Sequence, residues 1–431
     1  MFWQKELETL KREKLEALQL KRLKETAARV YAKVPYYKKL FKGKGVAPKD
    51  IKTLADISKL PFTTRDDLQK NYPDKLLTIK HHDTMRLHTS SGTTGKPKAV
   101  FFTKNDIETA ANNIARCLTM TGVTKADVLQ NMMSYGLFTG GLMMHYGAEK
   151  IGALVIPSAV GNTERQLMLM QDFGTTCIHL TPSYALYLSD IFEKKGAAFR
   201  KKLKLKRAYM GAEPYTEETK NKIEKILKLK VFNSYGLTEM NGPGVAFECE
   251  YQTGMHLWED CYLMEVVDPK TNRSLPDGEI GELILTTLNR EGMPLLRYRT
   301  RDLTAIIPGK CRCGRTHRRI MRIKGRADDM FIIRGVNIYP QQIERVLMSV
   351  THVEKNYQIY LEDNDRMTVK VEITKKLFDG NLDNLKKLQI DLTEKIRTEV
   401  LARPNVELVE PGTLPVSEGK AKRVFDNRKI Y

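Results

Sequence analysis

The sequence predicts an α/β protein with a large N-terminal domain of layered helices and strands, which includes a β-rich subdomain, and a small, mobile α+β C-terminal domain. A chain of 431 residues is too long for a single core. Between about residues 60 and 230, strand-like and helix-like patterns alternate, and from about 255 to 325 short strands and turns replace them. We therefore expect an N-terminal domain at 1–325, its subdomain at about 245–325, and a C-terminal domain at 326–431.

The expected elements follow from hydrophobic periodicity and turn residues. An amphipathic helix should cover residues 4–34 and end before Pro35. The α/β region should contain strands 154–157, 177–180 and 207–210 and helices 164–172, 184–195 and 217–227. The β-rich region should contain strands 263–267, 281–286, 303–307 and 321–323. The C-terminal module should contain strand 331–333, helix 340–349, strands 356–361 and 367–373 and helix 382–401, followed by a tail of turns and basic residues.

Composition indicates an ordinary globular protein, with 41% hydrophobic and 29% charged residues. No apolar run approaches the ~20 residues of a membrane span. Residues 1–24 are charged throughout and include several glutamates, which argues against secretory and mitochondrial targeting. We expect a cytoplasmic protein with no membrane partner.

The net charge of +20 favours anionic ligands such as nucleotides, coenzyme A or nucleic acid. The basic runs at 194–206 and 220–230 are interpreted as solvated helix faces. The sequence lacks an RNP-type aromatic motif and a helix-turn-helix signature. We therefore expect small anionic ligands and no nucleic acid.

The most informative motif is a glycine- and hydroxyl-rich loop between two expected strands at 85–89 and 99–103. Its glycines allow sharp turns and close approach of backbone N–H groups, while its hydroxyls and lysines suit a polyphosphate. The spacing differs from that of a Walker loop. A plain glycine-rich hairpin is the alternative, but it would not need so many of these residues. The candidate phosphate-binding residues are Ser90, Ser91, Gly92, Thr93, Thr94, Gly95 and Lys96.

Two later motifs add nucleotide chemistry. In the segment 234–239, Tyr235 beside Gly236 can stack on a purine, Thr238 can donate to a phosphate, and Glu239 is a hard oxygen ligand suited to Mg²⁺. Asp302, at an expected strand start, can accept hydrogen bonds from ribose hydroxyls. A surface strand with salt bridges is the alternative interpretation for Asp302.

Two further motifs suggest movement. Glycines flank paired carboxylates in the segment 323–330, which fits a hinge between domains. In the segment 415–423, the glycine-flanked Lys420 can reach an acyl or phosphoryl oxygen.

Together these motifs resemble those of the adenylate-forming acyl-CoA synthetase superfamily. Over about residues 36–428 the chain is similar to its phenylacetate–CoA ligase branch, as the segments 135–141, 161–166, 211–214, 242–246 and 328–335 indicate. The resemblance implies the adenylate-forming fold and two half-reactions. A carboxylate attacks the α-phosphate of ATP to give an acyl-adenylate and pyrophosphate, and coenzyme A then forms a thioester and releases AMP.

The resemblance also implies roles for individual residues. The loop at 90–98 would hold the β- and γ-phosphates, Glu239 would hold Mg²⁺, Thr238 would contact the α-phosphate and Asp302 would bind the ribose. Lys420 would contact the carboxylate and the α-phosphate during adenylation. Arg326, counted among the nucleotide-binding residues, and Asp328 would lie at the hinge. The adenine would be framed by Gly211, Ala212, Glu213, Pro214 and Tyr235, with Gly236 beside them.

By the same resemblance, Tyr135, Phe138, Gly140 and Gly141 match the segment that lines the acid pocket in this branch. Their glycines leave room for a flat ring. Ordinary core packing is the alternative interpretation of this segment. The expected substrate is an aromatic carboxylate, above all phenylacetate. Two other functions remain open: adenylate transfer to another acceptor without a thioester, and a non-catalytic, basic, zinc-containing binding protein. The presence of Lys420, Glu239 and Asp302 together argues against the second.

A structural zinc site is predicted from Cys249, His256, Cys311 and Cys313, which offer three thiolates and one imidazole in a closed set. Four unrelated buried residues are the alternative. His317 is an alternative fourth ligand, although its place after Arg315 favours a surface loop. The N-terminal helix is a candidate contact for a homodimer.

Overall fold

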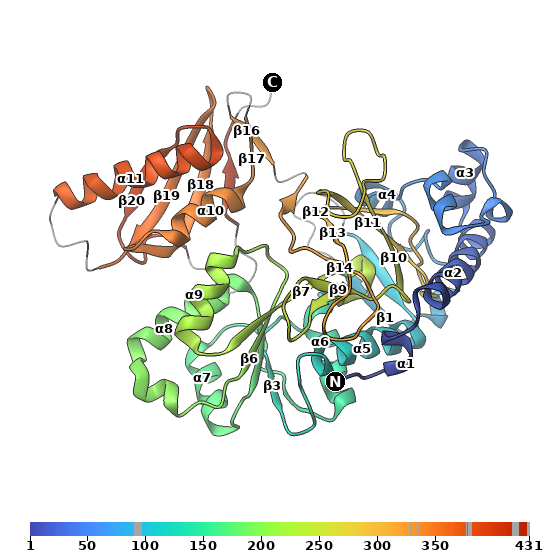
Figure 1. The fold of residues 1–431 in the computed structure, drawn as a ribbon, viewed down its shortest axis with the longest axis horizontal. Coiled ribbons are helices and arrows are strands. Elements are labelled where there is room, and N and C mark those ends of the chain that lie inside the picture. Colours follow the sequence, from blue (N-terminus) through green and yellow to red (C-terminus); the bar gives the residue numbers. More distant parts are fainter. Residues whose placement is uncertain are drawn as a thin grey trace.

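The computed structural model describes residues 1–89, 97–327, 330–333, 336–375, 377, 382–415 and 422–428. Its larger part carries the N-terminus, and a smaller module, drawn in orange and red, lies beside the helices α8 (Pro182–Lys201) and α9 (Glu217–Leu227) (Figure 1). The predicted α/β fold class is confirmed, because helices cover a mixed sheet in the larger part and the module has its own sheet and core.

The N-terminus forms the helices α1 (Lys5–Glu8), α2 (Arg12–Lys33) and α3 (Pro35–Gly43). One continuous helix was expected, but the chain leaves helical geometry at Thr9 before α2 begins. The buried face of α2 joins the main core through Leu23, Ala27 and Val30. Across the described parts of the chain, no helix has both the length and the apolar character that a membrane crossing needs.

The end of α1 is tied to a loop far along the chain. The guanidinium of Arg315 donates to the carboxylate of Glu8 at 2.7 Å, and both side chains are almost fully buried. The backbone N–H of Thr316 donates to the carbonyl of Glu8 at 3.1 Å. The first residues therefore close over the segment around residue 315.

A nine-stranded sheet forms the centre of the larger part, in the order β13-β14-β9-β8-β7-β6-β5-β3-β4. The strands from β7 to β4 are parallel, and the others pair antiparallel. Their bounds are β3 Val128–Asn131, β4 Leu154–Ile156, β5 Cys177–Leu180, β6 Arg207–Met210, β7 Lys230–Leu237, β8 Gly242–Glu248, β9 Met255–Leu257, β13 Ile306–Ile307 and β14 Arg319–Ile320.

Helices cover both faces of this sheet, as expected for buried parallel strands. Alternate residues show the two sides: Tyr209 and Phe232 belong to the core beneath α5 and α6, whereas Ala208 and Val231 belong to the core beneath α7, α8 and α9. The expected helices in this region are confirmed. The bounds are α5 Lys104–Thr119, α6 Thr139–Ile151, α7 Thr163–Asp172, α8 Pro182–Lys201 and α9 Glu217–Leu227.

A second, antiparallel sheet has the order β10-β11-β12-β15, with β10 Tyr262–Val267, β11 Gly281–Thr287, β12 Tyr298–Thr304 and β15 Gly325–Arg326. The strand expected at 303–307 is split, because β12 ends in this sheet and β13 crosses to the large one. The strand expected at 321–323 is wrong: the strand there is β14, which lies just before it. Outside the sheets, Thr64 caps the short helix α4 (Arg65–Lys70).

The strands β1 (Arg86–Thr89) and β2 (Ala99–Phe102) pair antiparallel, which confirms the strand–loop–strand arrangement around the glycine-rich loop.

The C-terminal module contains every element that the sequence predicted. Its four-stranded sheet has the order β20-β19-β18-β21, and the helices α10 and α11 pack on it. The expected tail of turns in fact contains β20 and β21, which pair in parallel with β19 and β18. The bounds are β16 Phe331–Ile333, β17 Val336–Ile338, α10 Pro340–Ser349, β18 Val353–Glu362, β19 Arg366–Ile373, α11 Leu382–Val400, β20 Asn405–Val409 and β21 Val424–Asp426.

Candidate functional site

Three predicted site segments lie at one edge of the nine-stranded sheet. The strands β3, β5, β6 and β7 are parallel neighbours, so their carboxyl ends meet at the same edge. The segment 132–141 follows β3, the segment 211–214 follows β6, and Thr238 comes directly after β7. The strand β3 lies between β4 and β5, which makes this edge a topological switch point, where α/β sheets bind ligands.

The turn after β6 has a tightly fixed backbone. A Cβ on Gly211 would lie 2.5 Å from the carbonyl oxygen of Ser234, so only glycine fits against β7. Ala212 has a φ of 70°, in the left-handed region. The carboxylate of Glu213 accepts hydrogen bonds from the N–H and hydroxyl of Ser183, at 3.0 and 2.9 Å. This turn is therefore anchored to the start of α8. 

A similar constraint applies to Gly236, whose Cβ would lie 2.1 Å from the carbonyl oxygen of Gly242.

Glu239 is a buried carboxylate in the short 3₁₀ turn after β7. Lys98, at the base of the glycine-rich loop, forms an ion pair with it, and the hydroxyl of Tyr298 donates to the same oxygen at 2.8 Å. Burial acts to raise the pKa of Glu239, but the Lys98 ammonium together with hydrogen bonds from the backbone and Tyr298 holds this pKa below its usual value. The site thus presents an ionised carboxylate paired with Lys98.

Asp302 lies close to two other predicted site residues. The hydroxyl of Tyr235 donates to its carboxylate at 2.7 Å, and the guanidinium of Arg326 lies 3.6 Å from its other oxygen. Burial, followed by the neighbouring Asp302, raises the pKa of Tyr235 well above its usual value, so the hydroxyl keeps its proton. The expectation that Asp302 begins a strand is wrong, because β12 starts four residues earlier, at Tyr298.

The predicted acid-binding segment is held by hydrogen bonds to its own strand. The side-chain amide of Asn131 donates to the hydroxyl of Tyr135 and to the carbonyl of Gly141, each at 2.7 Å. A Cβ on Gly141 would lie 2.4 Å from a backbone oxygen of the same segment. Gly140 has only an ordinary contact at 3.5 Å, and Phe138 is 48% exposed. The segment therefore has a defined shape, in which Gly141 is required by backbone packing.

The sequence did not indicate two buried polar residues beneath this segment, His179 and Asn131. The Nδ1 of His179, in β5, lies 2.9 Å from the amide oxygen of Asn131, in β3. Burial lowers the pKa of His179 to about 3, so the ring is neutral and its Nδ1–H donates. The signal that could have revealed this pair is a polar residue in the last two positions of both β3 and β5.

Several predicted residues lie outside the described part of the chain. They are the hinge residue Asp328, the lysine Lys420 and the loop residues Ser90, Ser91, Gly92, Thr93, Thr94, Gly95 and Lys96.

The four predicted zinc ligands lie together, with their ligand atoms all within 4.8 Å of one another. The sulfurs of Cys249 and Cys311 are 3.7 Å apart, and the sulfur of Cys313 is 3.2 Å from Nε2 of His256. Tetrahedral zinc, with bonds of about 2.0–2.3 Å, requires ligand atoms roughly 3.3–3.8 Å apart. The Nδ1–H of His256 donates to the carbonyl of His317 at 2.9 Å, which leaves Nε2 free to bind a metal.

His317 is not a fourth ligand, and the expectation that it lies on a surface loop is wrong. Its side chain is buried, its Nδ1 accepts from the N–H of Glu259 at 2.8 Å, and its Nε2–H donates to the carbonyl of Leu7 at 3.0 Å. Both ring nitrogens are therefore used within the protein.

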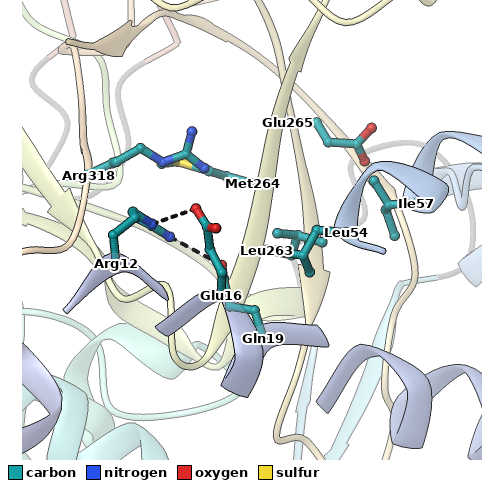
Figure 2. A pocket seen from close by; sticks show the side chains of 9 residues that line it. All are labelled: Arg12, Glu16, Gln19, Leu54, Ile57, Leu263, Met264, Glu265 and Arg318. Carbon is teal, nitrogen blue, oxygen red and sulfur yellow. Dashed lines mark hydrogen bonds and ion pairs between the residues drawn. The ribbon is translucent and has the colours of Figure 1, made fainter. Parts of the chain in front are cut away.

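A pocket of about 350 Å³ lies elsewhere, between α2, the 3₁₀ helix η2 (Leu54–Lys59) and β10 (Figure 2). None of the predicted site residues lines it. Its charged side chains are paired: Arg12 contacts Glu16 and Glu259, and Glu265 contacts Arg297. We interpret it as the seam where the N-terminal helix meets the β-rich sheet.

Comparison with known proteins agrees with this arrangement. Residues 15–289 match the family model for AMP-binding enzymes, and residues 335–428 match that for the AMP-binding enzyme C-terminal domain. A phenylacetate-coenzyme A ligase of Thermus thermophilus is 46% identical over 446 aligned positions that span both chains completely.

Two crystal structures of a 2-hydroxyisobutyryl-CoA ligase are also similar. One, in the postadenylation state with an acyl-adenylate, has a TM-score of 0.92 at 26% identity. The alignment covers 98% of this chain and 91% of the ligase chain. The other, in the thioesterification state, has a TM-score of 0.73 at 27% identity. The alignment covers 99% of this chain and 93% of the ligase chain.

The chain belongs to the AMP-binding family of adenylate-forming enzymes. Within that family it is a member of the phenylacetate–CoA ligase branch, and is thus an AMP-forming acid–CoA ligase that uses ATP and coenzyme A. The predicted superfamily and branch are confirmed.

Proposed function

We propose that this enzyme joins an aryl acid, phenylacetate in particular, to coenzyme A through an acyl-adenylate. The main support is the convergence of the Lys98–Glu239 pair and the Asn131–Tyr135 segment at one edge of the sheet. Phosphoryl chemistry requires positioned charge at such an edge, and the acid must lie beside it. The choice of an aryl acid rests on the relative that is 46% identical.

Each described residue then has a task. Glu239 is an ionised oxygen ligand suited to Mg²⁺, which when bound neutralises charge on the phosphates. Thr238 donates to the α-phosphate. Asp302, held by Tyr235 and Arg326, accepts from the ribose, while the turn at 211–214 frames the adenine.

The small domain, at 326–431, takes part in both half-reactions. By the family resemblance, Lys420 contacts the carboxylate and α-phosphate during adenylation, and a hinge at Asp328 lets the domain rotate before the thioester forms. The higher TM-score against the postadenylation structure supports assigning the present arrangement to the adenylation side of the cycle.

The first test measures release of pyrophosphate and AMP from MgATP with a panel of aromatic and aliphatic acids, with and without coenzyme A. We expect AMP and thioester to form together, with phenylacetate among the best acids. Pyrophosphate release without any thioester would instead favour another acceptor. ATP binding with no acid-dependent turnover across the panel would favour a binding protein.

A lysine pair provides a matched control for the adenylation step. Lys420→Ala should abolish acid-dependent pyrophosphate release but preserve thioester formation from added acyl-AMP. Lys422→Ala, whose ammonium lies 4.7 Å from the Phe425 ring centre, should preserve both steps. Equal loss of both steps in Lys420→Ala would contradict the assigned role.

We also propose that Cys249, His256, Cys311 and Cys313 hold one structural Zn²⁺. Their spacing and the hydrogen bond that orients His256 support this set. Zinc would fasten together two segments whose cysteines are 62 residues apart. Metal analysis should find about one zinc per chain, reduced in Cys311→Ser and unchanged in Cys117→Ser, a buried cysteine outside the cluster. Folded protein without zinc would contradict the proposal.

A further inference from the structure

The small domain is joined to the large one by a hydrogen bond between two helices. The hydroxyl of Thr219, fully buried in the first turn of α9, donates to the carboxylate of Glu344 in α10 at 2.6 Å. The other oxygen of Glu344 accepts from the hydroxyl of Tyr357 in β18 at 3.1 Å. Glu344 is thus held by its own domain and aimed at the other.

A second contact crosses the same interface. Lys355 of β18 is only 5% exposed, although a lysine is rarely buried without a partner. Its ammonium forms ion pairs with Asp190 and, at 3.4 Å, with Glu193, both on α8. The helix α10 lies against α9 (Figure 1). Polar pairs join α10 to α9 and β18 to α8.

Lys355 itself is buried, whereas the side chains of Asp190 and Glu193 are 30% and 58% exposed, so the ion pairs lie at the rim of the interface. Burial, together with Lys355, lowers the pKa of Lys222 on α9. Burial, together with Asp190, raises the pKa of Glu354 on β18. These charged side chains form one cluster that draws on α8 and α9 of the large domain and on β18 of the small domain. The pairing of charges in this cluster therefore depends on how the two domains are placed.

We propose that Glu344 and Lys355 form an interdomain latch that holds the small domain in the adenylation arrangement and thereby sets the partition between the two half-reactions. Each contact joins the two domains, so rotation of one against the other separates the partners. A contact made in only one arrangement shifts the equilibrium by its own free energy. The partition rests on the proposed function, but the docking itself does not.

Charge reversal tests the latch directly. Lys355→Glu would place a carboxylate against Asp190 and Glu193, and we expect the ratio of docked to undocked enzyme to fall by roughly tenfold, as for the loss of one charge-assisted hydrogen bond. Single-turnover pyrophosphate release should fall in proportion to the docked fraction, while thioester formation from added acyl-AMP should be equal or faster. Thr219→Val should act in the same direction with a smaller effect.

Domain position needs its own measurement, independent of activity. Spin labels on unnatural amino acids at Asp172 of α7 and Lys386 of α11, both exposed, report the interdomain distance by electron paramagnetic resonance. The distance distribution of the unmodified enzyme should contain one main docked population, which Lys355→Glu broadens or moves. This distance measurement reports domain docking even if the enzyme activates none of the tested acids.

A swap and a control complete the test. The double variant Lys355→Glu with Asp190→Lys should restore both the docked distance and pyrophosphate release. Lys395→Glu, which alters an exposed lysine paired with Asp391 inside α11, should change neither. Unchanged distances in Lys355→Glu, or equal loss of both half-reactions without a change in distance, would overturn the latch.

Discussion

Acidification should destabilise this enzyme through His179. The ring is buried one residue before the end of β5, and its Nδ1–H donates to Asn131, which in turn holds Tyr135 and Gly141. Burial lowers the pKa of His179 to about 3 in the folded protein. In the unfolded chain the pKa of a histidine is about 6.5.

The sign and size of the change in the free energy of unfolding with pH follow from these two pKa values. Because the folded pKa is the lower one, the unfolded chain binds the proton first, and the stabilisation is fully present above about pH 6.5 and lost as the pH falls towards 3. Each pH unit in this window costs about 1.4 kcal/mol. Between pH 7 and pH 5, His179 alone should lower the free energy of unfolding by about 2 kcal/mol.

Urea denaturation followed by fluorescence of the buried Trp258 would measure this term. His179→Gln, which keeps an amide donor for Asn131, should be less stable at pH 7 but lose about 2 kcal/mol less than the unmodified protein on going to pH 5. His82→Gln, an exposed control, should keep the original pH dependence. Identical pH slopes in His179→Gln and the unmodified protein would refute the reasoning.

Three other substitutions test separate contacts. Tyr298→Phe removes a hydrogen bond to the ionised Glu239, which is typically worth about 1.5–3 kcal/mol, so urea denaturation should show a loss of that size in the free energy of unfolding; an unchanged free energy of unfolding would contradict this. Gly211→Ala forces a methyl group against a β7 carbonyl and should cost about 1–3 kcal/mol, seen as a lower melting temperature and weaker ATP binding; an unshifted melting curve would be the contrary result. Glu8→Ala leaves buried Arg315 without its carboxylate and should cost about 3–5 kcal/mol in urea denaturation, whereas a loss below 1 kcal/mol would show that the pair is replaced by water.

Local patterns predicted most of the fold. The strands β5 and β6 and the helix α9 were placed correctly because apolar periodicity and flanking turns mark them clearly. The strands β20 and β21 were missed, because each is short and is stabilised by parallel partners far away in the sequence. The same limitation explains the misplaced strand at 321–323, where the neighbouring segment β14 pairs with β9 and β13.

The site was predicted as residue types but not as contacts. The sequence indicated Glu239, but its ion pair with Lys98 spans 141 residues and depends on the fold. The link between Tyr235 and Asp302 spans 67 residues and joins two different sheets. The four predicted zinc ligands were the exception, since cysteine and histidine spacing carried that prediction, and their side chains do lie together.

The tie between Glu8 and Arg315 has a consequence for synthesis of the chain. The two residues are 307 positions apart, so at about 5–20 residues per second Glu8 is synthesised roughly 15–60 seconds before Arg315. During that interval the first turns have no surface to close on, and Cys249 emerges before Cys311 and Cys313. The large domain should therefore complete its folding only after the segment around residue 315 has emerged.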